Sequence, residues 1–509
     1  MPGGDYIMSL NFSIEKSYKP LSDHNPVMVQ RFGADPYAMV YNGRVYVYMT
    51  LDDPSQELGE NGEVKENSYS KIDKISVISS DDLVNWTDHG TVYAAGDTGA
   101  ANWGKNSWAP AAAWKNIDGK DRFFLYFANS GNGIAVLSAD SPVGPFTDPI
   151  NGPLISRDTP TCAEVTWLFD PAVLMDDDGN SYIYFGGGVP SEDKASDPGT
   201  ARVAKLGADM ISLEGDPKPI ENVSYLFEDS GINKIGGRYF YSYCSNFSMS
   251  KEAEKEKGFE QGEIVTMVSD DPMGPFSEAA PVLKNPGHFF GLGGNNHHCM
   301  FEFGGKYYIA YHSRILEESM GLLKGYRCTG IDSLELDQGS APSKSLMTRK
   351  GPEQVKAFDP YEETRAVTMS NAAGITASQF GETAQKYGSG DMIVTGIHSG
   401  SWVSVSGADF GEAGAKGIEV YVRGLGADDS TGKAEQSRST AENGGPCKIH
   451  ICLDSPKAEP AGSVVIDSGI TKELTKVTGS FDKAVTGKHD VYFVFEGEGF
   501  EFYSWKFLS

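Results

Sequence analysis

One pattern of hydrophobic and polar residues recurs five times along the chain: an alternating strand rich in aromatic residues, introduced by a glycine-containing turn. The copies are residues 41–50 (YNGRVYVYMT), 122–130 (RFFLYFANS), 177–186 (DDGNSYIYFG), 235–245 (IGGRYFYSYCS) and 303–313 (FGGKYYIAYHS). Alternation with a period of two, bounded by turn residues, predicts β-strands. A strand motif that returns at a regular interval is typical of a radially repeated β architecture.

Three of the copies are followed by a second shared pattern: a strand, then Ser and Asp, then a turn that ends in Trp or Phe. It occupies residues 77–90, 136–149 and 268–279. Each unit is therefore expected to contain several antiparallel strands rather than a single hairpin. Counting the units predicts a five-bladed β-propeller in residues 1–350.

The pattern changes after the last repeat. Residues 344–363 are mixed and polar and indicate a linker. Beyond them the chain is rich in glycine, with short β runs at 401–405, 417–422 and 490–495. This spacing predicts a β-sandwich of the jelly-roll type in residues 358–509, so the predicted fold class is all-β throughout. The polar residues 427–445 are expected to form a long exposed loop.

Composition agrees with a protein rich in turns and strands, because its 509 residues include 60 Gly and 26 Pro and 11% of them are aromatic. The formal net charge of −27 repels polyphosphate and argues against nucleic acid as a partner, but it does not repel a neutral polymer. No stretch approaches the roughly 18 apolar residues of a membrane span, so no membrane partner is expected.

The cysteines and the N-terminal residues give information on the cellular location of the protein. The six cysteines lie mostly in apolar runs without paired spacing, which favours buried thiols; pairing of Cys447 with Cys452 across a hairpin is the alternative. The first twenty residues lack a basic segment followed by an apolar one, so no secretory signal is predicted. Two locations stay open: the cytoplasm, or outside the cell after removal of a signal.

Two Asp-Pro pairs stand in apolar surroundings directly before repeats. Asp35 lies in residues 31–41 (RFGADPYAMVY) and Asp170 in residues 166–175 (TWLFDPAVLM). Taken alone, an Asp before Pro is typical of a turn. A carboxylate among apolar residues needs a partner or a function, however, and its occurrence on two blades favours function. Asp35 is a candidate general base.

A third carboxylate precedes the fourth repeat, in residues 225–234 (YLFEDSGINK). Neighbours on a strand face opposite ways, so either Glu228 or Asp229 faces inward. Glu228 follows the apolar run and is the predicted inner residue. Three converging carboxylates suit glycoside hydrolysis: an acid protonates the leaving oxygen, a base takes a proton from water, and a third carboxylate keeps the acid protonated.

The fifth repeat opens with paired histidines, in residues 291–303 (GLGGNNHHCMFEF). Either His297 or His298 binds a metal ion or an ordered water at the axis, or the histidine is a buried residue bonded to the backbone. No Cys/His spacing indicates catalytic zinc, and no organic cofactor is predicted.

Four further side chains are candidates for contact with sugar. Trp108 and Trp167 offer faces for stacking, although core packing is the commoner role of any one tryptophan. Asn296 and Arg314 offer hydrogen bonds, and the alternative for Arg314 is to hold a carboxylate.

Together these motifs resemble glycoside hydrolase family 43, five-bladed propellers with an inverting mechanism. The matching segments lie in order within residues 25–314: NPVMVQRFGADPYAMVYNGRVYVYMT, NSWAPAAAWK, TWLFDPAVLMDDDGNSYIYFGG, FEDSGINKIGGRYFYSYCSNF and GGNNHHCMFEFGGKYYIAYHSR. The resemblance implies that Asp35 is the general base and Glu228 the general acid. It implies that Asp170 tunes the acid and orients sugar, and that His297 contacts a central ion, often calcium, directly or through water.

Within the family the chain is most similar to arabinoxylan arabinofuranohydrolases, which remove α-L-arabinofuranosyl branches from xylan. The implied partner is a plant cell-wall polysaccharide or its oligosaccharides. β-Xylosidases and arabinanases share the three carboxylates, so a β-xylosidase or a bifunctional enzyme on short oligosaccharides is the alternative. A non-catalytic carbohydrate-binding propeller is the alternative of another class.

Residues 358–509 resemble carbohydrate-binding module family 6. That family has Glu-Ala-Glu and a late Asp as ligands of a structural calcium; here the positions read Arg365-Ala366-Val367 and Tyr503. A cation cannot replace a carboxylate ligand, so this calcium is predicted to be absent. Residues 471–478 carry no aromatic ring, and Glu501 replaces the usual sugar-binding Asn. The module is expected mainly to dock on the propeller and shape its rim.

Overall fold

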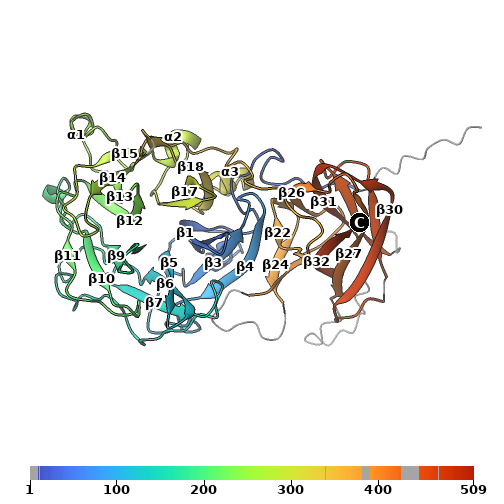
Figure 1. Ribbon diagram of the computed structural model, residues 1–509, viewed down its shortest axis with the longest axis horizontal. Coiled ribbons are helices and arrows are strands. Elements are labelled where there is room, and N and C mark those ends of the chain that lie inside the picture. The colour runs from blue at the N-terminus through green and yellow to red at the C-terminus, as the bar shows by residue number, and fades with distance from the viewer. Residues whose placement is uncertain (1–9, 11, 339, 381–389, 426–445, 468) are drawn as a thin grey trace, which may run out of the picture.

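The computed structural model describes residues 10, 12–338, 340–380, 390–425, 446–467 and 469–509. A five-bladed β-propeller is followed by a curled β-sandwich (Figure 1), which confirms the predicted all-β fold class. The predicted loop at 427–445 lies outside the described residues. No helix among the described residues is long and apolar enough to cross a membrane.

Each blade is an antiparallel sheet whose strands follow sequence order, with the first strand contacting the first strands of neighbouring blades. The blades contain, in turn, β1 (Ala34–Tyr41), β2 (Arg44–Thr50), β3 (Lys74–Ser80) and β4 (Trp86–Tyr93); β5 (Trp108–Ile117), β6 (Lys120–Ala128) and β7 (Ile134–Ala139); β8 (Ala172–Met175), β9 (Ser181–Phe185), β10 (Arg202–Leu206) and β11 (Lys218–Pro219); β12 (Leu226–Ile235), β13 (Arg238–Ser245), β14 (Ile264–Ser269) and β15 (Ala280–Leu283); β16 (His298–Phe303), β17 (Lys306–Ser313) and β18 (Cys328–Ser333). Short elements surround them: α1 (Lys251–Lys257), α2 (Pro286–Phe290), α3 (Ile315–Met320), β19 (Leu336–Asp337) and β20 (Ala341–Pro342).

The repeated aromatic strands are the second strand of each blade: β2, β6, β9, β13 and β17. In the first blade, Tyr41 pairs with Arg44 around a two-residue turn. Asn42 and Gly43 in that turn have φ of 47° and 72°. Positive φ at both positions defines the type I′ turn, whose twist matches that of the strands it joins.

Apolar side chains fill each of the five spaces between neighbouring blades. Tyr48 and Phe123 belong to the cluster between the first and second blades, and Tyr184 and Tyr241 to the cluster between the third and fourth. The aromatic residues of the repeat thus form the core between the blades, and three further clusters complete the ring.

The segment before β1 closes the ring by lying along β18. Val27 N donates to Thr329 O at 3.0 Å, and Gly33 N donates to Arg327 O at 3.0 Å. Asn25 Nδ2 donates to Ile331 O at 2.9 Å. The start and the end of the propeller are therefore hydrogen-bonded to each other.

The sandwich has two layers around a core that includes Val403, Phe493 and Trp505. One layer has the order β23-β26-β31-β28-β29 and the other β30-β27-β32-β25-β24, and a single pairing of β29 with β30 makes them one curled sheet. The chain after the propeller also contains β22 (Thr368–Met369), which lies outside this sheet. The strands of the sandwich are β21 (Thr364–Arg365), β23 (Asn371–Ala373), β24 (Thr376–Gln379), β25 (Met392–Thr395), β26 (Trp402–Asp409), β27 (Ala415–Gly424), β28 (Cys447–Leu453), β29 (Gly462–Ile466), β30 (Thr475–Val485), β31 (Lys488–Glu496) and β32 (Phe500–Leu508).

The two domains exchange chain segments. β22 pairs with β4 and becomes the outer strand of the first propeller blade. In the other direction, Phe12 and Ile14 pack on the sandwich, and Trp402 Nε1 donates to Glu15 O at 2.9 Å. The residue boundaries at 350 and 358 stay a prediction, because the chain crosses between the domains twice. All six cysteines are buried, as predicted.

Candidate active site

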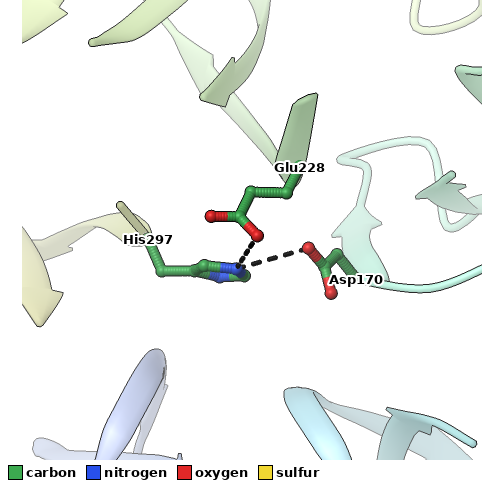
Figure 2. Close-up of side chains that lie close together, drawn as sticks. All are labelled: Asp170, Glu228 and His297. Carbon is green, nitrogen blue, oxygen red and sulfur yellow. Dashed lines mark ion pairs between the residues drawn. The ribbon is translucent and has the colours of Figure 1, made fainter. Parts of the chain in front are cut away.

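The first strand of each blade brings one predicted site residue to the propeller axis. Asp35 lies at the start of β1, Trp108 begins β5 and Glu228 lies in β12, while Asp170 and His297 stand just before β8 and β16. All five line one cavity of about 650 Å³, and all but Trp108 are buried. Figure 2 shows Asp170, Glu228 and His297 converging from three separate segments of the chain.

The backbone turns sharply where these strands begin. Asp35, Ala109, Asp170 and Asp229 have φ of 47°, 42°, 49° and 70°. This left-handed region costs a residue other than glycine roughly 1–2 kcal/mol. Irregular pairing accompanies the turn in β1, β5 and β12. Such strain is concentrated at functional sites, and here it directs side chains toward the axis.

His297 stands at the centre of the carboxylates. Its Nε2 lies 3.3 Å from Asp170 Oδ2, 3.8 Å from Glu228 Oε2 and 3.9 Å from Asp35 Oδ1. Its Nδ1 lies 3.3 Å from Asp229 Oδ1. Burial disfavours the charged ring, but the carboxylates of Asp35, Asp229 and Asp170 outweigh this and raise the pKa of His297 well above its ordinary value. The carboxylates around the ring therefore favour its protonated form, which offsets part of their negative charge.

Asp35 is held by cations. Arg327 Nη1 donates to Asp35 Oδ1 at 2.9 Å, while its Nε and Nη2 donate to the two oxygens of Asp52, each at 2.9 Å. His312 Nδ1 lies 3.0 Å from Asp35 Oδ1. Burial would raise the pKa of Asp35, but Arg327, His297 and His312 hold it well below its ordinary value. Asp35 is therefore ionised at neutral pH, as a proton acceptor must be.

The pKa of Asp170 is shifted in the opposite direction to that of Asp35. Burial raises the pKa of Asp170 to about 6, with His297 opposing the shift and the nearby charge of Glu228 adding to it. Oxygen atoms of Asp170 and Glu228 lie within 4.8 Å of each other. Because two ionised carboxylates at this distance repel, the charge of Glu228 favours the protonated form of Asp170.

Two groups of aromatic rings line the cavity. Trp167 packs edge-on against Phe227 with ring centroids 5.2 Å apart, and Phe227 packs in the same way on Phe247 at 5.3 Å. Phe247 is 43% exposed, so this series runs from the cavity to the surface. Trp108 and Tyr69 form the second group, in which Trp108 Nε1 donates to Tyr69 O at 3.0 Å. Sugar stacking on Trp108 and Trp167 stays a prediction.

Two of the residues proposed to bind sugar do not line this cavity. Asn296 is fully buried; its Nδ2 donates to Gly262 O at 3.0 Å and its backbone N donates to Glu228 Oε1 at 3.3 Å. Arg314 pairs with Glu317 and lines a small adjoining hollow of about 50 Å³. It therefore holds a carboxylate, which was the alternative expected for it. Asn295, rather than Asn296, lines the cavity.

Several residues of the site were missed by sequence reasoning. Arg327 lies outside the repeated motif, in the sequence GYRC, and its only signal was an Arg beside an apolar strand. His312 ends the fifth repeat, so its place at the end of a repeated strand was an available signal. Asp229 is the neighbour of Glu228, and the sequence predicts Glu228 as the inner residue of this pair because Glu228 follows the apolar run.

Asp170, Glu228 and His297 offer donor atoms close enough together to surround a metal ion. Calcium takes roughly six to eight oxygen ligands. This group offers two carboxylates and one ring nitrogen, which are fewer oxygen ligands than calcium takes. These three side chains alone do not complete a calcium site, and the calcium ion at the propeller axis, contacted by His297 directly or through water, stays a prediction.

In the sandwich, Arg365 lies where the resemblance places a calcium ligand. Its guanidinium lies 3.5 Å from the ring centre of Tyr503 and pairs with Asp391. Tyr503 OH donates to Asp391 Oδ2 at 2.6 Å, and Phe380 packs on Tyr503 with centroids 4.5 Å apart. Arg423 lies over Phe380 at 4.8 Å. A built-in cation beside the carboxylate is the physical basis for the predicted absence of calcium.

A five-bladed propeller whose axial cavity gathers three buried carboxylates and several aromatic rings has the construction of a glycosidase. The model of the glycosyl hydrolases family 43 matches residues 24–340, and the chain belongs to this family. The model of the carbohydrate binding module (family 6) matches residues 426–509. Both resemblances noted in the sequence are confirmed.

Relatives extend the match to nearly the whole chain. The chain is 44% identical to an arabinoxylan arabinofuranohydrolase of Paenibacillus polymyxa, over 96% of this chain and 74% of that protein. It is 41% identical to an arabinoxylan arabinofuranohydrolase of Bacillus subtilis (strain 168), over 96% of this chain and 93% of that protein. A crystal structure of a glycoside hydrolase family 43 arabinoxylan arabinofuranohydrolase from Bacillus subtilis in complex with cellotetraose is similar at a TM-score of 0.88 and 40% identity, and covers 97% of this chain and 99% of that one.

Proposed function

We propose that the protein is an inverting α-L-arabinofuranosidase that removes arabinofuranosyl branches from arabinoxylan or arabinoxylo-oligosaccharides. The observation that carries the proposal is the meeting of Asp35, Asp170 and Glu228 around His297 in a cavity lined by aromatic rings. The arabinoxylan activity named for the two relatives that match nearly all of this chain supports the choice of substrate.

The proposed mechanism uses one acid and one base. Glu228 gives its proton to the leaving oxygen as the glycosidic bond breaks. Asp35 takes a proton from the water that attacks the anomeric carbon on the opposite face. His297 Nε2 lies 3.9 Å from Asp35 Oδ1 and 3.8 Å from Glu228 Oε2, so these oxygens are at most about 8 Å apart. This bound is compatible with the roughly 6.5–9.5 Å separation of inverting glycosidases.

Asp170 has the supporting role in this mechanism. Its ionised form repels a second negative charge on Glu228 and so favours the protonated acid before the bond breaks. The pKa of about 6 means that Asp170 itself is ionised only above mildly acidic pH. Asp170 is also close enough to the cavity to accept a hydrogen bond from a sugar hydroxyl.

The aromatic series from Trp167 to Phe247 supports a polymeric substrate. A single arabinofuranose ring needs only the axial part of the cavity, whereas the series continues to the surface. Apolar ring faces offer stacking surfaces to the pyranose rings of a main chain. The sandwich domain, joined to the first blade through β22, is proposed to dock on the propeller and shape its rim.

The proposal is tested by the sugars released from three substrates in parallel: arabinoxylan, xylobiose and linear arabinan. Arabinose from arabinoxylan is the expected product. Xylose from xylobiose, without arabinose from the polymer, would assign a β-xylosidase instead, and no release from any substrate would leave a binding propeller. Proton NMR of the first-formed sugar tests inversion, for which the expected product is the β-anomer of arabinofuranose.

A further inference from the structure

Asp229, the residue after Glu228, lies behind the cavity rather than in it. Its side chain is 2% exposed and does not line the cavity. Its φ of 70° departs from the alternation of a regular strand and turns the side chain toward the axis beside Glu228. A backbone held in this sparsely populated region indicates that surrounding contacts fix it there.

Asp229 contacts two residues of the proposed catalytic group. Its backbone N donates to Asp170 Oδ2 at 2.9 Å, and its Oδ1 lies 3.3 Å from His297 Nδ1. His297 is the ring around which all three proposed catalytic carboxylates gather. A displacement of Asp229 therefore moves both Asp170 and the ring.

A chain of buried hydrogen bonds holds Asp229 from behind. Its Oδ2 lies 2.5 Å from His298 Nδ1, and His298 Nε2 lies 2.7 Å from Ser242 Oγ. A Cβ atom on Gly231 would lie 2.5 Å from Ser242 Oγ and 2.9 Å from His298 Cε1, so only glycine leaves room for this chain. The order Ser-His-Asp is that of a nucleophilic triad, but all three side chains are buried and none lines the cavity that holds Asp35, Asp170 and Glu228. His298 lines a separate cavity of about 530 Å³. This series of hydrogen bonds fixes the position of Asp229.

The carboxylates on both sides of His297 determine the orientation of its ring. Ionised carboxylates only accept hydrogen bonds, and His297 faces a carboxylate at each ring nitrogen. Nδ1 lies 3.3 Å from Asp229 Oδ1, and Nε2 lies 3.3 Å from Asp170 Oδ2 on the side of the proposed catalytic carboxylates. Asp229 thus sets which way the ring faces.

We propose that Asp229 is a positioning residue, anchored by His298 and Ser242, that orients His297 and Asp170 for the reaction without touching the substrate. The inference rests on the roles proposed above for Asp35, Asp170 and Glu228. A loss of about 1 Å in the placement of such groups is known to cost about 100-fold in rate.

The test compares Asp229→Asn, Asp229→Ala and Ser242→Ala in the full chain on an aryl arabinofuranoside. We expect kcat to fall by about 100-fold in Asp229→Asn, further in Asp229→Ala and least in Ser242→Ala, with KM changed less than about twofold. The control is Asp176→Asn, which removes another buried carboxylate, bonded to Tyr239 OH at 2.6 Å. The control should lower the melting temperature and leave kcat unchanged.

A double-mutant cycle separates positioning from a general structural defect. If Asp229 acts through His297, then Asp229→Asn should cost little further kcat in a His297→Gln background. Full additivity would overturn the proposal, as would a kcat of Asp229→Asn equal to that of the wild type. A fall in kcat matched by weaker binding of arabinoxylo-oligosaccharide in a Glu228→Ala background would also overturn it. Inactive wild-type protein would instead refute the proposed function, so the two failures are distinguishable.

Discussion

The propeller axis and the sandwich place the same kinds of side chain in different relations. Around the axial cavity, four buried carboxylates are paired chiefly with two cations, Arg327 and His297. In the sandwich, Arg365 pairs with Asp391 and Arg423 pairs with Glu501, one cation for each carboxylate. Buried carboxylates therefore outnumber their cations at the axis, whereas each of these two sandwich carboxylates has its own cation.

The aromatic rings of the propeller and of the sandwich also differ, in whether their faces are open or covered by a cation. In the propeller the series ends at Phe247, whose face is open to solvent. In the sandwich, the stack of Phe380 on Tyr503 has Arg423 over one ring and Arg365 over the other. Unmatched charge and open ring faces mark a place that meets a ligand, whereas matched charge and covered rings mark structure.

Loss of the acid should have the largest effect and should occur only at the axis. Glu228→Ala is expected to lower kcat on arabinoxylan by about 10²–10⁴-fold, while isothermal titration shows unchanged binding. Asp35→Ala should be inactive even on substrates with good leaving groups, because water still needs a base. The matched sandwich variant Glu501→Ala should lower stability and leave kcat intact. Near-wild-type turnover by Glu228→Ala would end the assignment of the acid.

Excess charge at the axis should make a neutral substitution stabilising there. The pKa of Asp170 is raised to about 6, so its contribution to stability is complete below about pH 4 and is lost as pH rises through 6. Asp170→Asn is expected to stabilise the protein at pH 7.5 by on the order of 2 kcal/mol, to change little at pH 4, and to lose activity. Thermal unfolding at the two pH values measures this. Destabilisation at pH 7.5 would contradict an excess of charge.

The exposed ring of Phe247 should contribute to the binding of the polymer but not to the binding of a small aryl substrate. Phe247→Ala is expected to raise KM for arabinoxylan by about 3- to 10-fold, because a stacking contact is removed, and to leave KM for an aryl arabinofuranoside unchanged. Phe380→Ala in the sandwich should change neither KM. Equal effects of Phe247→Ala on both substrates would place this ring inside the pocket for the cleaved sugar.

The smallest effect concerns calcium in the sandwich. Since Arg365 supplies the positive charge beside Asp391, a chelator should move the unfolding transition of the sandwich by less than about 1 °C. The double variant Arg365→Glu/Tyr503→Asp, which restores carboxylates at both positions, should instead melt at a temperature that rises with added calcium. A marked shift of the wild-type protein with the chelator would show that a metal ion contributes to its stability.

The sequence was informative where a repeat carried the information. Asp35 and Asp170 were predictable because a carboxylate stood in apolar surroundings at equivalent places of two blades, and the blades themselves followed from the aromatic strands. The residues that pair with these carboxylates were not predictable from the sequence. Arg327 reaches Asp35 across 292 residues and belongs to no repeated motif.

Details of local geometry also limited what could be predicted from the sequence. Asn295 and Asn296 are adjacent and chemically identical, so no pattern indicated which one lines the cavity. The pairing of β22 with β4 rests on two residues, too short a strand for alternation to show. The left-handed backbone at Asp229 breaks the alternation expected of neighbouring residues on a strand.

The same span between Asp35 and Arg327 has a consequence for synthesis of the chain. Translation at about 5–20 residues per second makes Asp35 roughly 15–60 s before its partner. Throughout that interval the first blade has a carboxylate without its cation, and burying it would be unfavourable by several kcal/mol. The nascent first blade should therefore stay open until Arg327 has emerged, and a chain that ends before Arg327 should be degraded rather than accumulate as an incomplete propeller.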